Sequence, residues 1–507
     1  MNPGGDPAQR LRLGVYAILI ALAAGNMSGR LLAVNSVNRA ELEQHVIRQR
    51  MAAIEKEFQA ENLPADLLAA KLAAASVRVE REERRQRPFL SANDRSRWLT
   101  IRALVEQGTF AIDDVLDRHV WNTIDMVKHR GRDGQMHLYS SKPPLYSVLL
   151  AGEYWLLREV TGWTLKDNPF EVGRLMLFTV NILPLMLMLA IVARLAERLG
   201  TTDWGRIFVV AAASLGTFLS TFAVVLNNHT VAAVSAAVAL YAIVRIRFDG
   251  DERTRWYALA GAAAAFTAAN ELPALAFLAL VAAALLVGNR RAWLVGFLPA
   301  AGVVVIAFFA ANYIAHDSLR PPYAHRSATD PEDDWYRYTY TLAGQERQSY
   351  WNDPQGIDRG EPSPLVYAVH SLVGHHGVFS LTPVWLLTVW GLWRWLRYGD
   401  ARRRQLAAGI SLLSLTCMVF YIGLRPQEDR NYGGMTSGLR WLFWLAPLWL
   451  VAMLPAADRL ATSRWRMAVG LLLLAFSTLS VSYPTWNPWV QPWIYNWLEA
   501  CGWPGLA

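Results

Sequence analysis

The sequence predicts an all-α polytopic membrane protein with about 11 transmembrane helices. Of its 507 residues, 53% are hydrophobic, which is too apolar for an ordinary soluble enzyme. Apolar runs of about 20 residues, the length that spans a bilayer, recur along the chain. Arginines flank most of these runs, so membrane topology explains the net charge of +8 better than nucleic-acid binding does.

Eleven candidate spans follow from the apolar runs. The first comes after Arg10 and Arg12 and lacks a clear small-x-small cleavage site, so we expect a retained anchor rather than a signal peptide. The two cysteines, Cys417 and Cys501, give no disulfide framework or metal pattern. The expected spans are 12–34, 173–193, 207–226, 229–244, 256–270, 272–288, 293–314, 378–393, 406–424, 441–457 and 467–483.

The arginines also predict the orientation. With a cytoplasmic N-terminus, the cytoplasmic side holds nineteen arginines, whereas the short external loops hold only Arg425, Arg430 and Arg440. Basic residues in short loops stay on the cytoplasmic side, so we expect a plasma- or inner-membrane protein. The expected units are 1–34 with the first span, an external loop at 35–172, spans 2–7 in 173–314, an external loop at 315–377, spans 8–11 in 378–483 and an external aromatic tail at 484–507.

The two external loops are long enough to be functional. Residues 38–87 of the first loop are rich in Ala, Glu, Arg and Gln, with apolar residues at helical spacing, and Asn38 with Glu41 fits a capping box. This part is expected to be an inserted helical hairpin facing solvent, a spacer or a partner-contact element. The other part, 88–172, contains juxtamembrane motifs.

The first motif is "SANDRSRWLTIRALVEQGTFAID", residues 91–113. Its apolar residues follow a helical stripe and Gly108 is a suitable helix end. Asn93 and Asp94 then lie at the N-terminal end of this helix. A carboxylate at that place serves by itself as a helix cap.

The second motif is "HLYSSKPPLYSVLL", residues 137–150. Two prolines suit the first turn of a helix, so Lys142 precedes a helix start near the membrane surface. Its ammonium group either extends to the interface as an anchor or holds an anion. The helix over 143–160 is expected to lie along the interface rather than cross it. If it crossed, the distribution of arginines between the two sides of the membrane would no longer fit the predicted orientation.

Together these residues resemble the first external loop of the GT-C glycosyltransferases. That superfamily includes the protein O-mannosyltransferases and the lipid A aminoarabinose transferases. In its members an acidic pair precedes a helix that carries an Arg and then a Gly, and a Lys-Pro-Pro-Leu stretch opens the next helix. Arg102 and Gly108 keep this spacing, which puts Asn93 and Asp94 at the acidic pair with an Asn in first place.

Four further stretches resemble the family, each at an external end of an expected span. "NNHTV" contains Asn228 and His229, and "AANELPAL" contains Glu271. "GHHGVFSLTP" contains His375 and His376, and "NYGGMTSGLRW" leads to Arg440. Each stretch is short, but their order and common placement on one face are more specific. Ionisable residues at membrane depth also tend to mark function.

The resemblance implies an inverting transfer of a sugar from a polyprenyl phosphate to a glycan, lipid or protein acceptor on the external face. The catalytic loop would be 88–172, with Asp94 as the base. Lys142, Arg440 and Arg102 would bind the donor phosphate. The expected supporting or acceptor-contacting residues are Asn93, Asn228, His229, Glu271, His375 and His376. The partners would be the lipid-linked sugar, its acceptor and the bilayer, without nucleic acid.

Other readings stay open. His370, His375 and His376, completed by Asp94 or Glu271, are considered as ligands for a divalent metal such as zinc or manganese. A transporter or flippase of lipid-linked glycans predicts two similar halves and charges near the bilayer midplane. A non-enzymatic scaffold predicts that the 38–87 hairpin carries the function. The loop at 315–377, rich in Tyr, Trp, Asp and Arg, is expected to contact the acceptor.

Overall fold

Helices make up most of the computed structural model, which is 71% helical. It describes residues 7–33, 39–61, 63–83, 89–117, 120–327, 329–485 and 487–503. Within these residues, seven helical segments are long and apolar enough to cross a membrane. They contain α1 (Pro7–Ala33), α6 with α7 (Pro169–Leu177, Leu183–Leu199), α9 (Asn228–Arg247), α12 with α13 (Arg290–Ala292, Leu298–His316), α17 (Ala401–Met418), α18 (Ala446–Leu460) and α19 (Arg464–Ser482). The segment with α17 continues to Gly423, and the segment with α18 begins at Arg440. The chain is therefore an integral membrane protein.

The other four expected spans correspond to shorter helices. These are α8 (Asp203–Leu215), α10 (Thr254–Asn270), α11 (Leu275–Leu286) and α16 (Leu386–Tyr398). The span expected at 207–226 is not one continuous helix, because α8 ends before Gly216 and a short 3-10 turn follows at Phe222–Val224. The count of eleven spans remains a prediction.

Two β-hairpins correct the expectation of an all-α fold. β1 (Met126–Arg130) pairs antiparallel with β2 (Met136–Ser140), and β3 (Thr339–Leu342) pairs with β4 (Gln345–Gln348). In the first hairpin the connection contains Gly134 at a φ of 81°, a conformation that suits glycine. The fold is therefore mostly helical, with one small hairpin in each long loop.

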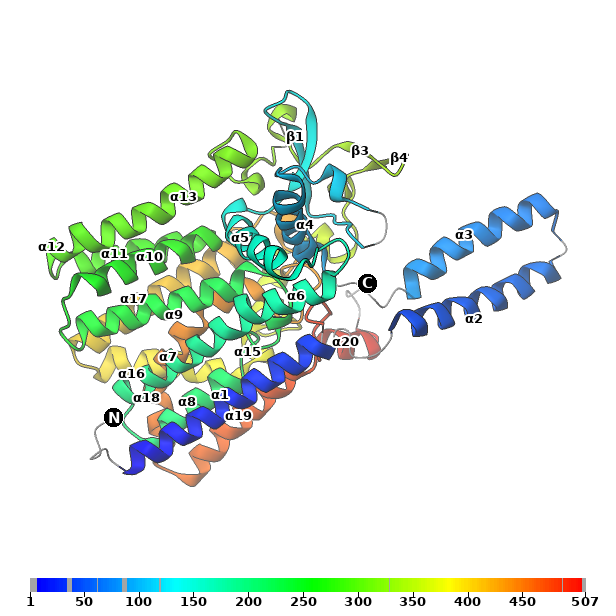
Figure 1. Ribbon diagram of the computed structural model, residues 1–507. Helices are drawn as coiled ribbons and strands as arrows, with labels where there is room; N and C mark the ends of the chain where they lie inside the picture. The colour runs from blue at the N-terminus through cyan, green and yellow to red at the C-terminus, as the bar shows by residue number, and fades with distance from the viewer. Residues whose placement is uncertain are drawn as a thin grey trace.

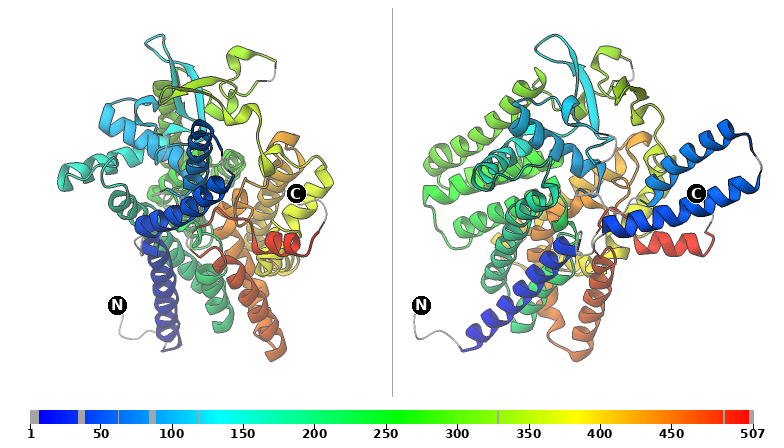
Figure 2. Two further views of the ribbon diagram at one scale, coloured as in Figure 1. Left: turned by 90° about the vertical axis from the view of Figure 1, so that its right-hand side faces the viewer. Right: turned by 45° about the vertical axis from the view of Figure 1, so that its right-hand side comes forward.

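The first long loop contains four helices. α2 (Arg39–Ala60) and α3 (Ala65–Glu83) pack against each other and project away from the other helices (Figures 1 and 2). α4 (Ala92–Gln107) packs against α5 (Pro144–Thr161), beside the two hairpins (Figure 1). The remaining short helices are α14 (Pro364–Leu372), α15 (Val378–Leu381) and α20 (Trp493–Ala500).

Local capping explains where α4 begins and ends. The Ser91 hydroxyl accepts a hydrogen bond from the Asp94 backbone N–H at 3.1 Å, which satisfies one of the free N–H groups of the first turn. Gly108 ends the helix at a φ of 73°, as the sequence predicts. Ten consecutive residues of α4, from Asp94 to Ala103, are buried, so this short helix is held on all sides.

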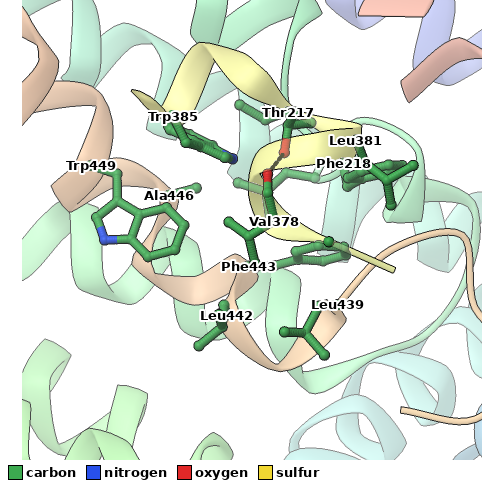
Figure 3. Close-up of a pocket in the computed structure, with 13 residues that line it drawn as sticks. Thr217, Phe218, Val378, Leu381, Trp385, Leu439, Leu442, Phe443, Ala446 and Trp449 are labelled. Carbon is green, nitrogen blue, oxygen red and sulfur yellow. Dashed lines mark hydrogen bonds between the residues drawn. The ribbon is translucent and has the colours of Figure 1, made fainter. Parts of the chain in front are cut away.

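A small cavity in the bundle is a packing void. Figure 3 shows its aromatic and aliphatic lining, with Phe218 and Phe443 on one side and Trp385 and Trp449 on the other. Its volume is about 30 Å³, far below the roughly 300–1,000 Å³ of ligand pockets. Charged side chains are absent from its lining among the residues that the structure describes. Polar chemistry must therefore be sought elsewhere.

Candidate active site

A second, much larger cavity lies where α4, α5 and α9 begin and where α10 meets α11. Its volume is about 600 Å³. Parts of the loops at 315–377 and 425–441 complete its wall. The charged residues that line it are six basic and four acidic ones: Arg95, Arg97, Lys142, Arg326, Arg425, Arg440, Asp125, Glu271, Asp358 and Asp429. The excess of basic groups favours an anionic ligand.

Arg97 supplies a buried positive charge from the first turns of α4. Its guanidinium donates to Asn93 Oδ1 at 2.6 Å and to Asn228 Oδ1 at 2.7 Å. Arg97 is only 4% exposed, and burial lowers its pKa from the ordinary value. Both acceptors are neutral amides, so these hydrogen bonds orient the guanidinium without cancelling its charge.

Glu271 gathers three donors at the junction of α10 and α11. The Asn228 amide donates to its Oε1 at 2.8 Å and the Tyr421 hydroxyl donates to its Oε2 at 3.1 Å. His229 Nδ1 also bonds to Oε1, while His229 Nε2 lies 3.2 Å from the Arg440 guanidinium. Because a guanidinium only donates hydrogen bonds, Nε2 of His229 is the acceptor of the bond from Arg440. The ring proton is therefore on Nδ1, which donates a hydrogen bond to Glu271. The network thus fixes the tautomer of His229.

Arg440 is held by a glycine turn. Its Nε donates to the Gly433 carbonyl at 2.9 Å, and its guanidinium lies 5.1 Å from the Trp489 ring centroid. Gly433 has a φ of 93°, and a Cβ there would lie 3.2 Å from Nε of Arg440. The glycine therefore permits both the turn and the close approach of the arginine.

Lys142 points into the cavity and pairs with Asp125. Its Nζ lies 3.1 Å from Asp125 Oδ1. The register of the first hairpin explains this pair. Met126 opposes Ser140 at the open end of the hairpin, so Asp125, just before β1, lies close to Lys142, just after β2. Burial lowers the pKa of Lys142, and Asp125 opposes that shift.

The pairing of the cations differs around the cavity. Lys142 pairs with Asp125, and Arg326 and Arg425 both pair with Asp429. In the part of the chain that the structure describes, Arg97 and Arg440 form no salt bridge; their hydrogen bonds go to two side-chain amides, an imidazole and two backbone carbonyls. These two guanidiniums are therefore the groups best prepared to receive an anion.

The second long loop covers the cavity with aromatic rings. Tyr323, Tyr336 and Trp351 line it. The Trp351 indole N–H donates to the Ile124 carbonyl at 3.0 Å, which ties this loop to the first one. Arg326 lies 5.3 Å and 5.2 Å from the Tyr336 and Trp351 ring centroids. The cavity lining therefore offers aromatic rings beside a planar guanidinium group.

Asp94, the expected base, lies behind the cavity wall. Its Oδ1 accepts from the Trp98 indole at 2.8 Å and from the Leu226 N–H at 2.9 Å, and its Oδ2 accepts from the Leu90 N–H at 3.2 Å. Asp94 is 1% exposed and is absent from the cavity lining among the described residues. Burial raises its pKa to about 7. Here the carboxylate ties the start of α4 to the segment before α9.

Arg102, an expected phosphate ligand, faces another way. Its Nε pairs with Glu106 at 2.9 Å, and its guanidinium lies 4.9 Å from the Trp121 ring centroid. Arg97 and Arg102 are five residues apart on one helix, so their side chains point about 140° apart. The structure therefore brings Arg97, and not Arg102, to the cavity.

His375 and His376 also lie outside the cavity lining. His376 stacks on Tyr432 with centroids 4.9 Å apart, and His375 stacks on His370 at 4.0 Å. They support the turn at 431–434 from behind. Among the described residues, no group of three or more His, Cys, Asp or Glu side chains is arranged to hold a metal ion. The three histidines therefore do not fit the metal site considered from the sequence.

The cavity thus brings together six of the ten expected site residues: Asn93, Lys142, Asn228, His229, Glu271 and Arg440. Sequence reasoning missed Arg97 and Asp125. Arg97 shares a helix face with Asn93 at i+4 spacing, which could have indicated it. Asp125 could have been found by recognising "GRDG" as a hairpin turn between two alternating segments, since the hairpin carries it to Lys142.

The chain is similar to solved structures of one kind of enzyme. An oligosaccharyltransferase of Archaeoglobus fulgidus in its apo form matches with a TM-score of 0.39 and 12% identity, over 82% of this chain and 55% of the other. AglB of the same organism, in complex with an inhibitory peptide and a dolichol-phosphate, matches with a TM-score of 0.38 and 10% identity, over 82% and 54%. The chain spans about half the length of these proteins.

No known family profile and no curated protein matches the sequence. The oligosaccharyltransferase is a GT-C membrane glycosyltransferase, the class that the sequence motifs resemble. At these TM-scores and identities, function has to be argued from the residues of the cavity.

Proposed function

We propose that this protein is a membrane glycosyltransferase. It transfers a sugar from a polyprenyl-phosphate-linked donor to a glycan, lipid or protein acceptor on the external face, with inversion at the anomeric carbon. The observation that carries the proposal is the cavity in which Arg97 and Arg440 keep uncompensated charges beside Asp125 and Lys142. A phosphate and a reacting hydroxyl would find complementary groups there.

Arg97 and Arg440 bind the donor phosphate. Each guanidinium offers a planar fork that matches phosphate oxygens. Both are already oriented by neutral partners, so little reorganisation is needed as negative charge develops on the leaving phosphate. Lys142 adds a third positive charge, balanced by Asp125 until a phosphate arrives.

Asp125 is the carboxylate that we assign as base. The oxygen of an acceptor hydroxyl attacks the anomeric carbon and its proton passes to Asp125, while the bond from that carbon to the donor phosphate oxygen breaks and polyprenyl phosphate leaves with the electron pair. Glu271 already receives three hydrogen bonds and acts as a positioning residue. Asp94 is a positioning residue as well, since its oxygens receive three bonds behind the wall.

The loop at 315–377 contacts the acceptor. Tyr323, Tyr336 and Trp351 present ring faces at the cavity, and such faces stack on sugar rings while nearby polar groups bind the hydroxyls. The arginine distribution of the sequence supports an external position for this end of the bundle, with the N-terminus in the cytoplasm.

The test is release of polyprenyl phosphate from a panel of polyprenyl-phosphate sugars by the full chain in lipid. Asp125→Asn should lower the rate per folded molecule about 10²–10⁴-fold, and the midpoint of thermal unfolding (Tm) should fall as well, because Lys142 loses its partner. Asp94→Asn is the matched comparison and should retain more activity than Asp125→Asn. A fully active Asp125→Asn beside an inactive, stably folded Asp94→Asn would return the base to Asp94. No release from any donor by the wild type would remove the proposed function.

A further inference from the structure

A third cavity, of about 380 Å³, lies between α9, α11 and α17. The residues that line it include Arg247, Val287, Arg402, Gln405, Gly409 and Leu413. Most of the lining residues are aliphatic or aromatic, and the polar ones gather where α9 ends and α17 begins. This is the end of the bundle away from the candidate active site, which uses the start of α9 and the residues before α11.

One wall of this cavity is open. A Cβ built on Gly409 would meet no atom within 4 Å, although Gly409 lies in the middle of α17. Val287, at the end of α11, is 79% exposed, whereas Leu413 on the opposite wall is 2% exposed. The cavity therefore runs from the buried core to the lipid-facing surface.

Two arginines flank the opening. The Arg247 guanidinium donates to Gln405 Oε1 at 3.0 Å, and that of Arg402 donates to the Phe248 carbonyl at 3.2 Å. In the described part of the chain neither forms a salt bridge with a carboxylate. Their neighbours Arg198 and Arg245 both do, with Asp249. An apolar cavity thus opens beside two positive charges that no acidic residue balances.

We propose that this cavity binds an anionic phospholipid. One acyl chain fills the space between α11 and α17, and the headgroup phosphate lies between Arg247 and Arg402. Basic pockets between membrane helices recognise anionic headgroups in this way, and a guanidinium fork suits phosphate oxygens. The predicted topology places this end at the cytoplasmic leaflet, where anionic lipids are found.

The donor lipid does not explain these features. Its phosphate belongs in the candidate active site, beside Glu271, at the other end of α11. α11 has 12 residues, which separates its two ends by about 18 Å. Arg247 and Arg402, at the opposite end of α11, would therefore bind a different lipid, one whose phosphate lies at that end. The inference is therefore independent of the proposed glycosyl transfer.

The test measures lipid retention by the full chain. Wild-type protein, extracted in mild detergent from membranes that contain phosphatidylglycerol and phosphatidylethanolamine, is analysed by native mass spectrometry. We expect one retained phosphatidylglycerol per chain. Gly409→Leu should abolish retention because its side chain fills the cavity, and leucine is a better helix former than glycine. Gly302→Leu is the control, since a Cβ on Gly302 in α13 also meets nothing within 4 Å but lies outside this cavity.

The headgroup is tested separately. Arg402→Gln should reduce the preference for phosphatidylglycerol over phosphatidylcholine in nanodiscs about fivefold, the effect of one basic residue at an anionic surface. Arg404→Gln, two residues along α17, should leave the preference unchanged. Retention by a Gly409→Leu variant with the wild-type Tm would overturn the proposal. Retention of a neutral phospholipid or of polyprenyl phosphate in place of phosphatidylglycerol would also overturn it.

Discussion

Arg198 and Arg253 at one end of the helix bundle have different partners from Arg97 at the other end. At the end away from the candidate active site, the side chains of Arg198 and Arg253 are 53% and 59% exposed and pair with Asp249 and Asp251. At the candidate active site, Arg97 is 4% exposed and hydrogen-bonds to amides. Burying a charge without a carboxylate partner is costly, so a fold keeps it where a ligand will use it. Burial among amides therefore distinguishes Arg97 from the exposed, paired arginines Arg198 and Arg253.

Among the arginines, the largest expected effect is loss of one that forms no salt bridge. Arg440→Gln should lower transfer about 10²–10³-fold, the usual cost of removing a donor that stabilises developing charge. Arg97→Gln should behave alike, whereas Arg102→Gln on the same helix should affect Tm more than transfer per folded molecule. The readout is polyprenyl phosphate release, normalised to folded protein. Equal losses of transfer in Arg97→Gln and Arg102→Gln would remove the distinction between them.

The next effect concerns pH. The pKa of Asp94 is raised from 3.8 to about 7 by burial, so the folded state binds a proton that the unfolded state releases between these values. Stability should therefore decrease as pH rises from about 4 to 7, by at most about 4 kcal/mol, and level off above. Thermal unfolding at a series of pH values measures this slope. Asp94→Asn should flatten it; an identical slope in the variant would assign it to another group.

A smaller effect separates two glycines that both have positive φ. Gly433→Ala combines an unfavourable φ of 93° with a close contact to Arg440, whereas Gly250→Ala at the opposite end has a φ of 72° and open space. Each should cost about 1–2 kcal/mol of stability from the backbone. Transfer should fall only in Gly433→Ala, because only there does the arginine move. Loss of transfer in Gly250→Ala would contradict this.

The smallest effect is expected from the paired arginines. Arg198 has an exposed side chain and an acidic partner, and such pairs contribute little. Arg198→Gln should change transfer by less than about twofold. A loss comparable to that of Arg440→Gln would show that exposure and pairing do not distinguish the two ends.

Sequence reasoning succeeded where one local signal was enough. Apolar runs predicted the helical segments, including α9 and α19, and Gly108 predicted the end of α4. The span expected at 207–226 was too long, because Gly216 and the turns that follow it are apolar enough to continue the run. Apolar composition indicates burial in the membrane, but it does not by itself require a continuous helix.

The sequence predicted most of the residues of the candidate site, but not how these residues are arranged. Asn93 and Asp94 are adjacent, yet one lines the cavity and the other lies behind the wall. That difference depends on the Leu226 N–H, which binds Asp94 from another segment, and a one-dimensional pattern does not contain it. Asp125 was missed because its role depends on the register of a hairpin that was read as loop.

The glycine turn at Arg440 completes the cavity network late in the sequence. The residues of the hydrogen-bond network in the cavity are spread from Asn93 to Arg440, so 439 of the 507 residues precede the last of them in the sequence. Without that residue, Glu271 and His229 lack the guanidinium that completes their network. The network therefore joins segments that are far apart in the sequence, and it needs the segment before α18 to be complete.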